Sequence, residues 1–138
     1  MSPALVMERF DIRLGPDDRR RLALEDFCSI LDLPASAKYD GTIERMARGL
    51  HPLSTDSTAD LDILFLRAVF AWLIADGEIH LKNLALLNIA EAGAKTCTSV
   101  RFAPLYDAVT TRVFPGWGAT AWQSSRTAGT IGSQGGAS

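Results

Sequence analysis

Four ionisable side chains and an asparagine lie within eight residues of one another in the middle of the chain. They are Asp76, Glu78, His80, Lys82 and Asn83. Apolar residues dominate the segments on both sides, 61–75 and 84–89. Polar groups between two core-forming segments cost free energy unless they have partners, and function is one reason why a sequence retains them. Residues 76–83 are therefore the first candidate for a functional site.

The spacing of the acid and the amide indicates a kind of chemistry. Glu78 lies five residues before Asn83, and the protein-kinase catalytic loop has the same spacing between an acid and an asparagine. In that loop the acid accepts the proton of the attacking hydroxyl, and the asparagine holds a magnesium ion. In kinases a second magnesium-binding acid follows a short strand pair. Here two strand candidates, residues 84–89 and 98–103, are joined by a turn candidate and followed by Asp107.

Several segments together resemble the HipA-type serine/threonine kinase toxins. Residues 78–83, Glu-Ile-His-Leu-Lys-Asn, resemble the D-x-H-x-K-N catalytic loop of that family, and residues 104–107, Pro-Leu-Tyr-Asp, resemble its metal-binding motif. Residues 7–11 are similar to its hinge segment, and residues 25–28 to a helix of its C-terminal lobe. The resemblance covers roughly residues 4–116, and the two catalytic motifs in this order are more specific than either motif alone.

The resemblance implies a catalytic role for three residues of the loop. Glu78 would be the general base, while His80 and Lys82 would orient the loop and meet phosphate charge. A hydrogen-bonded structural histidine and a solvated lysine are the alternatives for the last two. The family has aspartate at position 78, and one extra methylene moves the carboxylate by roughly 1.5 Å. Since a misplacement of about 1 Å can cost on the order of a hundredfold in rate, we expect Glu78 to be a weakened base.

ATP and magnesium are the cofactors that the resemblance implies. Asn83 and Asp107 would be the magnesium ligands, because magnesium prefers oxygen ligands and commonly takes one or two from the protein. A capping asparagine and a turn aspartate are the alternatives. The backbone of Glu8 and Phe10 would bond the adenine ring, in addition to phosphate contacts from the loop. A plain edge strand over residues 4–10 is the alternative there.

Composition limits the classes of function. A chain of 138 residues fits one domain, and a net charge of −2 gives no electrostatic reason to expect direct binding of nucleic acid or an anionic membrane. Cys28 and Cys97, with two histidines elsewhere, offer no zinc-ligand spacing. The sequence shows no signal peptide and no apolar run long enough to span a membrane, which predicts a cytoplasmic protein with reduced thiols.

Periodicity and turn signals predict mostly helices. A helix is expected from about Pro16 to Leu33, and a short one over residues 42–50. The strongest pattern, over residues 60–74, predicts a helix that is apolar on most sides and therefore buried. An interaction surface is the alternative explanation for its surplus of apolar residues.

Shorter segments carry turn and cap signals. Ser57 or Thr58 is the expected cap of the helix over residues 60–74. Asp76 is interpreted as a turn residue before a glycine. Residues 34–41, which contain Lys38-Tyr39, are interpreted as a structural loop, and residues 102–113 as holding a further short helix.

The composition changes after residue 116. Residues 117–138 are rich in glycine, serine, threonine and alanine and lack hydrophobic periodicity, which predicts a disordered tail. A change of translation frame near residue 116 is a second hypothesis. We therefore divide the chain into a HipA-like lobe, residues 1–116, and a disordered or frame-altered tail, residues 117–138.

The expected fold is mainly α with a small antiparallel β-hairpin, the C-terminal lobe of a HipA-like kinase. The inherited reaction would be transfer of the ATP γ-phosphoryl group to a protein serine or threonine. We expect little activity from the lobe alone, because no glycine-rich phosphate loop is seen and position 78 is Glu78. A split kinase completed by a separate N-terminal lobe and a non-catalytic binding module remain open. The implied partners are a protein substrate and an antitoxin of the DNA-binding type.

Overall fold

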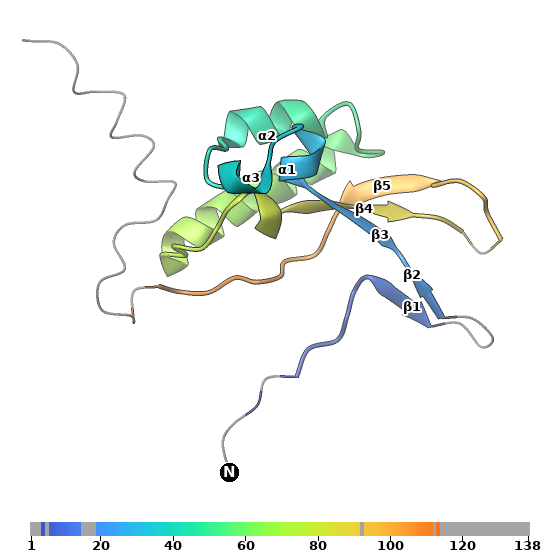
Figure 1. Ribbon diagram of the computed structural model, residues 1–138, viewed down its shortest axis with the longest axis horizontal. Helices are drawn as coiled ribbons and strands as arrows, with labels where there is room; N and C mark the ends of the chain where they lie inside the picture. The colour runs from blue at the N-terminus through green and yellow to red at the C-terminus, as the bar shows by residue number, and fades with distance from the viewer. Residues whose placement is uncertain (1–3, 5, 15–18, 92, 112, 114–138) are drawn as a thin grey trace, which may run out of the picture.

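The computed structural model describes residues 4, 6–14, 19–91, 93–111 and 113. Figure 1 shows helices gathered on one side of a small sheet, with a separate hairpin at the far end. The strands are β1 (Ile12–Leu14), β2 (Arg19–Arg21), β3 (Ala23–Asp26), β4 (Ala85–Ile89) and β5 (Ser99–Phe102). The helices are α1 (Phe27–Ile30), α2 (Ile43–Leu50) and α3 (Ser57–Ile74), with short 3-10 turns η1 (Ala35–Ala37) and η2 (Leu81–Asn83).

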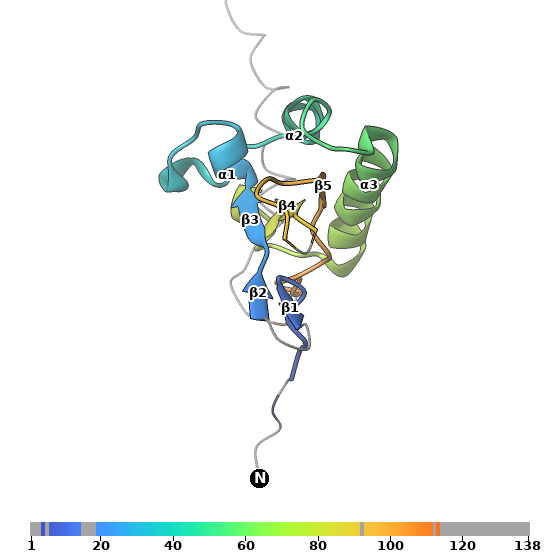
Figure 2. The same ribbon diagram turned by 90° about the vertical axis from the view of Figure 1, so that its right-hand side faces the viewer.

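The central sheet is antiparallel with the order β3-β4-β5. Strands β4 and β5 form the predicted hairpin, with Leu86 opposite Phe102. Strand β3 adds to the other edge of β4, with Leu24 opposite Leu87. Figures 1 and 2 show the β1–β2 hairpin below this sheet, at the opposite end from α2. The mainly α lobe with an antiparallel hairpin is thus confirmed, with a third strand in the sheet.

The core lies between the sheet and the helices. Phe27 at the start of α1 is fully buried and its ring centroid lies 5.9 Å from that of Phe102 on β5. Cys28 is buried beside it. The buried cluster comprises Phe27, Cys28, Met46, Leu50, Leu64, Leu81, Leu84, Leu86 and Phe102. Because Leu81 and Leu84 flank Asn83 in the chain, this core fixes the segment that carries the predicted site.

The helix predicted from about Pro16 to Leu33 is wrong. Residues 19–21 and 23–26 are strands, and the helix is limited to Phe27–Ile30, with Asp26 as its N-cap. Strand β3 pairs along its whole length with β4, some sixty residues later in the chain. Tertiary pairing of this kind overrides local helix propensity, so a pattern confined to residues 16–33 could not reveal it.

The two later helices are confirmed, with changes at their ends and faces. Thr42 caps α2, and Asp56 caps α3 by accepting a hydrogen bond from the backbone N–H of residue 59, so neither Ser57 nor Thr58 is the cap. Helix α3 is not buried on all sides. A row of its large apolar side chains is 37–66% exposed. They are Phe65, Leu66, Val69, Phe70, Trp72 and Leu73.

Within the described residues, the edge-strand alternative for residues 4–10 and the short helix expected within residues 102–113 are both wrong. Residues 4 and 6–10 form no strand, and residues 103–111 form no helix. The segment 103–111 instead runs extended along α3 and η2, held by long-range contacts. Across the residues that the structure describes, no helix is long and apolar enough to cross a membrane. The tail over residues 117–138 lies outside the described residues.

Candidate functional site

The two predicted magnesium ligands lie in contact, although 24 residues separate them in the chain. Asn83 Nδ2 lies 3.3 Å from Asp107 Oδ2, and the same nitrogen donates to the backbone carbonyl of Glu78 at 3.2 Å. Asn83 is buried, and Asp107 is exposed. The φ angle of Asp107 is 54°, in the left-handed region that aspartate tolerates better than most residues. The fold thus brings the two motifs into contact at Asn83 and Asp107.

The turn before the loop is tied to the segment after the metal motif. Thr111 Oγ1 donates to the carbonyl of Ala75 at 3.0 Å and accepts from Gly77 N–H at 3.1 Å. A Cβ at position 77 would overlap the Thr111 side chain, so this close approach requires glycine. Asp76 Oδ1 accepts from the N–H of Glu78 at 3.0 Å, which is the turn chemistry predicted for Asp76.

Glu78 and His80 face the loop that contains Tyr39. The Tyr39 hydroxyl donates to Glu78 Oε2 at 3.2 Å, and the Tyr39 ring meets the His80 ring edge-on with centroids 5.2 Å apart. Sequence reasoning assigned Tyr39 to structure only and missed this contact. The pair is 39 residues apart, and no local signal relates the two positions.

His80 is buried in the site. Its pKa is lowered, first because burial disfavours the charged imidazolium and then because the positive charge of Lys38 lies nearby. Within the described residues, its Nδ1 atom is buried and has no hydrogen-bond partner. A neutral, enclosed imidazole fits the role of orienting the loop better than direct contact with phosphate charge.

Lys82 forms an ion pair with Asp26. Its Nζ lies 2.6 Å from Oδ2 of Asp26, the cap of α1. The hydrogen bond and charge of Asp26 raise the pKa of Lys82. Both side chains are partly exposed, so this ion pair contributes little to stability. A phosphate oxygen that bound Lys82 would compete with Asp26 for the same charge.

The hinge segment reaches the site through one aromatic contact. Phe10 packs on Tyr106 with ring centroids 5.6 Å apart, and the Tyr106 hydroxyl donates to the carbonyl of Lys82 at 3.1 Å. Burial raises the pKa of Tyr106 to about 12. Glu8 is exposed. The structure therefore places Phe10, the loop and the metal motif in one continuous region, and the predicted contact of Glu8 with the adenine ring stays a prediction.

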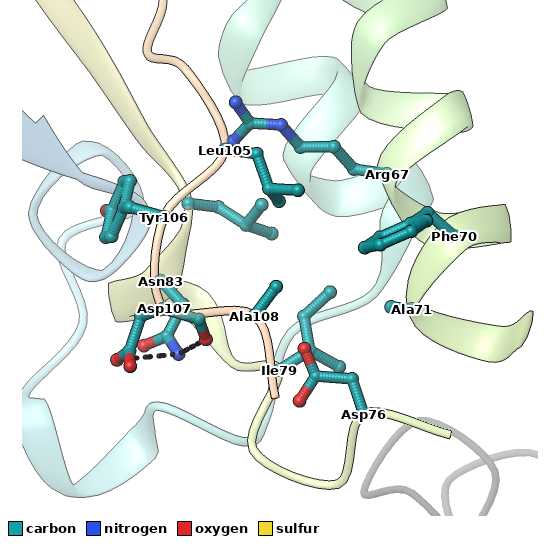
Figure 3. A pocket seen from close by; sticks show the side chains of 11 residues that line it. Arg67, Phe70, Ala71, Asp76, Ile79, Asn83, Leu105, Tyr106, Asp107 and Ala108 are labelled. Atoms are coloured by element: carbon teal, nitrogen blue, oxygen red, sulfur yellow. Dashed lines mark hydrogen bonds between the residues drawn. The ribbon is translucent and has the colours of Figure 1, made fainter. Parts of the chain in front are cut away.

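A small apolar pocket lies between α3 and the metal-motif segment (Figure 3). Phe70 and Ala71 of α3 form one wall, and Leu105 and Ala108 form the other. Arg67 also lines it, and burial lowers the pKa of Arg67 to about 10. One guanidinium nitrogen donates to the carbonyl of Ala103, and the guanidinium lies 4.4 Å from the centre of the Phe102 ring.

Replacing Asp76 by asparagine is expected to raise the melting temperature more at pH 7 than at low pH. Burial, then the negative charges of Asp107 and Glu78, raise the pKa of Asp76. A raised carboxyl pKa in the folded state adds stability at low pH that is lost as the pH rises through that pKa. Asparagine carries no charge and keeps one oxygen for the N–H of Glu78. Because the N–H of Val109 also bonds to the Asp76 carboxylate, the expected gain is the effect of the removed charge less that of a weakened hydrogen bond.

The advantage of Asp76→Asn should shrink as the pH falls toward about 4, the ordinary range of aspartate. Thermal melts of the wild type and of Asp76→Asn at pH 7 and at about pH 4 measure the difference in melting temperature. Asp62→Asn, on the exposed side of α3, is the control and should change the melting temperature little at either pH. An equal gain for Asp76→Asn at both pH values would contradict the explanation.

The donor set of the site fits magnesium. Asn83 and Asp107 supply an amide and a carboxylate from two segments already in contact, and magnesium usually takes one or two such oxygens together with phosphate and water. The described part of the chain has no group of three or more histidine, cysteine, aspartate or glutamate side chains placed to hold a metal ion.

The fold is that of a HipA-like C-terminal lobe. The family model of the HipA-like C-terminal domain matches residues 1–135, so the chain belongs to the family of HipA-like C-terminal domains.

Two relatives show how far the likeness extends. "Putative kinase Y4dM" of Sinorhizobium fredii is 36% identical over 84 residues, which are 61% of this chain and 19% of that protein. A chain of the Shewanella oneidensis MR-1 toxin–antitoxin complex of HipA, HipB and operator DNA has the same fold, with a TM-score of 0.67 and 23% identity. That match covers 83% of this chain and 29% of the Shewanella chain. The chain therefore spans less than a third of either relative.

Proposed function

We propose that this chain is the C-terminal catalytic lobe of a HipA-like serine/threonine protein kinase. In this role it supplies the base and the magnesium ligands for transfer of the ATP γ-phosphoryl group to a protein hydroxyl. The observation that carries the proposal is the contact between Asn83 and Asp107, at 3.3 Å. It joins two motifs that the family resemblance assigns to one metal site, and the family membership supports the same reaction.

Each residue of the loop has one task in the proposed mechanism. Bound magnesium and ATP would supply the transferable phosphoryl group and neutralise its charge. Asn83 and Asp107 would hold the metal, and Glu78 would accept the proton of the attacking hydroxyl. Lys82 would exchange Asp26 for a phosphate oxygen, and buried His80 would orient the loop. Most of the acceleration in such reactions comes from positioning and charge stabilisation. In kinases the glycine-rich loop that covers the phosphates belongs to the N-terminal lobe.

A non-catalytic binding module is the second candidate. The exposed apolar row on α3 favours it, because a large exposed apolar patch is typical of a protein–protein contact. The Shewanella relative is part of a complex with HipB, which makes an antitoxin of the DNA-binding type the partner to test. In this function the loop residues would keep their contacts without binding nucleotide.

The test is a thermal melt of the purified chain with and without Mg-ATP. At ten times its dissociation constant, a ligand stabilises the folded state by about 1.4 kcal/mol, which corresponds to a rise in melting temperature of roughly 4 °C. The rise should require magnesium and should be lost in Asp107→Ala. A cooperative melt without any rise would contradict nucleotide binding and favour the binding module.

Asp32→Ala is the matched control for Asp107→Ala. Asp32 has a φ of 53°, against 54° for Asp107, so both substitutions place alanine in the left-handed region at similar backbone cost. Asp32 lies in the turn after α1, outside the site. The control should lower the melting temperature but keep the rise with Mg-ATP. Loss of the rise in both variants would show that backbone strain, not the metal ligand, explains the result.

A further inference from the structure

The loop over residues 38–41 is packed tightly against the proposed catalytic loop. The carbonyl of Lys38 accepts a hydrogen bond from the N–H of Leu81 at 2.9 Å. A Cβ at position 41 would overlap the Leu81 side chain, so only glycine allows the approach. These two contacts place Tyr39 directly beside Glu78 and His80.

The Tyr39 side chain is itself held on two sides. Its ring meets His80 edge-on at 5.2 Å between centroids, and Lys38 Nζ lies 4.8 Å from the ring centre. Aromatic pairs prefer edge-on arrangements of this kind, and a cation over a ring face adds further attraction. Tyr39 is 41% exposed, and these two contacts direct its hydroxyl toward Glu78 Oε2 at 3.2 Å.

Glu78 needs such a partner more than an aspartate would. Glutamate has one more rotatable bond than aspartate, and each free rotor lets the carboxylate occupy several positions. A hydrogen bond from a fixed donor selects one of them. The carboxylate of an aspartate at the same backbone position would lie roughly 1.5 Å closer to the backbone, by the length of one C–C bond. It would then be too far from the Tyr39 hydroxyl to accept its hydrogen bond.

We propose that Tyr39 is a positioning residue for the Glu78 carboxylate. The inference rests on the proposed function, in which Glu78 is the general base. The Tyr39 hydroxyl donates to Oε2 of Glu78 and thereby orients the other carboxylate oxygen toward the attacking hydroxyl. The proton moves from that hydroxyl to the free oxygen, and the Tyr39 hydroxyl keeps its own proton throughout. The glutamate in place of aspartate is therefore matched by a donor elsewhere in the fold.

The first measurement is the tyrosine spectrum of the intact chain. The chain has two tyrosines, so labelling with ¹³Cζ-tyrosine gives two resonances, and Tyr106 is an internal reference because its hydroxyl bonds to the Lys82 carbonyl. Glu78→Asp should shift the Tyr39 resonance and leave that of Tyr106 in place. Glu78→Gln keeps the length and an acceptor oxygen and should shift the Tyr39 resonance less. A Tyr39 resonance unmoved by Glu78→Asp would overturn the proposal.

The second measurement is a double-mutant cycle on thermal stability, which isolates a pairwise interaction. Tyr39→Phe should lower the melting temperature of the wild type and of Glu78→Gln by a similar amount, and should leave that of Glu78→Asp unchanged. Equal losses in all three backgrounds would overturn the proposal. The rise with Mg-ATP should persist in Tyr39→Phe, because Tyr39 does not contact Asn83 or Asp107. If Mg-ATP failed to raise the melting temperature of the wild type, the result would contradict the proposed function but not the contact between Tyr39 and Glu78.

Discussion

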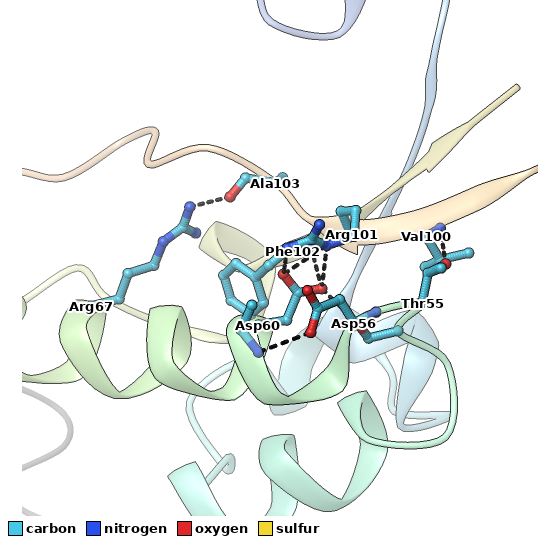
Figure 4. A network of polar contacts seen from close by, with 10 residues as sticks. Thr55, Asp56, Asp60, Arg67, Val100, Arg101, Phe102 and Ala103 are labelled. Atoms are coloured by element: carbon cyan, nitrogen blue, oxygen red, sulfur yellow. Dashed lines mark hydrogen bonds and ion pairs between the residues drawn. The ribbon is translucent and has the colours of Figure 1, made fainter. Parts of the chain in front are cut away.

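Replacing Asp60 by alanine is expected to destabilise the chain by about 3 kcal/mol, because its buried carboxylate accepts several hydrogen bonds and a hydrogen bond to a charged group contributes about 1.5–3 kcal/mol. Asp60 is fully buried at the first turn of α3. Its carboxylate accepts hydrogen bonds from the Arg101 guanidinium, the N–H of Phe102 and the hydroxyl of Ser54 (Figure 4). Alanine would leave a backbone N–H and a half-buried guanidinium without an acceptor.

A loss of this size is a large part of the 5–15 kcal/mol that stabilises an ordinary domain. Denaturant unfolding followed by circular dichroism measures it. Asp56→Ala is the matched control, because Asp56 caps the same helix through one exposed hydrogen bond, and loss of such a cap costs about 1 kcal/mol. If both variants lost the same free energy, the Asp60 network would not be what joins α3 to β5.

Asn83→Asp is the second substitution with a large expected effect. In the absence of magnesium it should lower the free energy of unfolding by about 2–3 kcal/mol. The variant loses the Nδ2 donor to the Glu78 carbonyl, which leaves a polar group unpaired, and it sets a second carboxylate against Asp107, 3.3 Å from the former nitrogen. Like charges that close disfavour the folded state.

Magnesium should reverse the effect of Asn83→Asp, because a divalent cation neutralises both carboxylates. The melting temperature of the variant should therefore rise with magnesium chloride alone, whereas the wild type should need Mg-ATP for a comparable rise. Asn88→Asp, the same change at a half-buried position of β4, should show no recovery. If magnesium failed to stabilise Asn83→Asp, positions 83 and 107 would not form a metal site.

Much of the candidate site could be predicted from the sequence because its signals are local. The acid–asparagine spacing of Glu78 and Asn83, followed by a hairpin and Asp107, is a short ordered pattern, and the structure places the two proposed metal ligands in contact. The same holds for α2, α3 and the β4–β5 hairpin, whose periodicity and turn residues lie within one stretch of chain. The roles of Glu78, His80 and Lys82 remain proposals.

Only the tertiary structure decided the remaining features, and each depends on residues far apart in the chain. Strand β3 exists because β4 offers it an edge, and the exposed row on α3 depends on what packs against that helix. Asp26 reaches Lys82 across 56 residues, and Tyr39 reaches Glu78 across 39. Periodicity and propensity describe what a segment favours by itself. Pairing, burial and side-chain contacts depend on the neighbours that the whole fold brings to that segment.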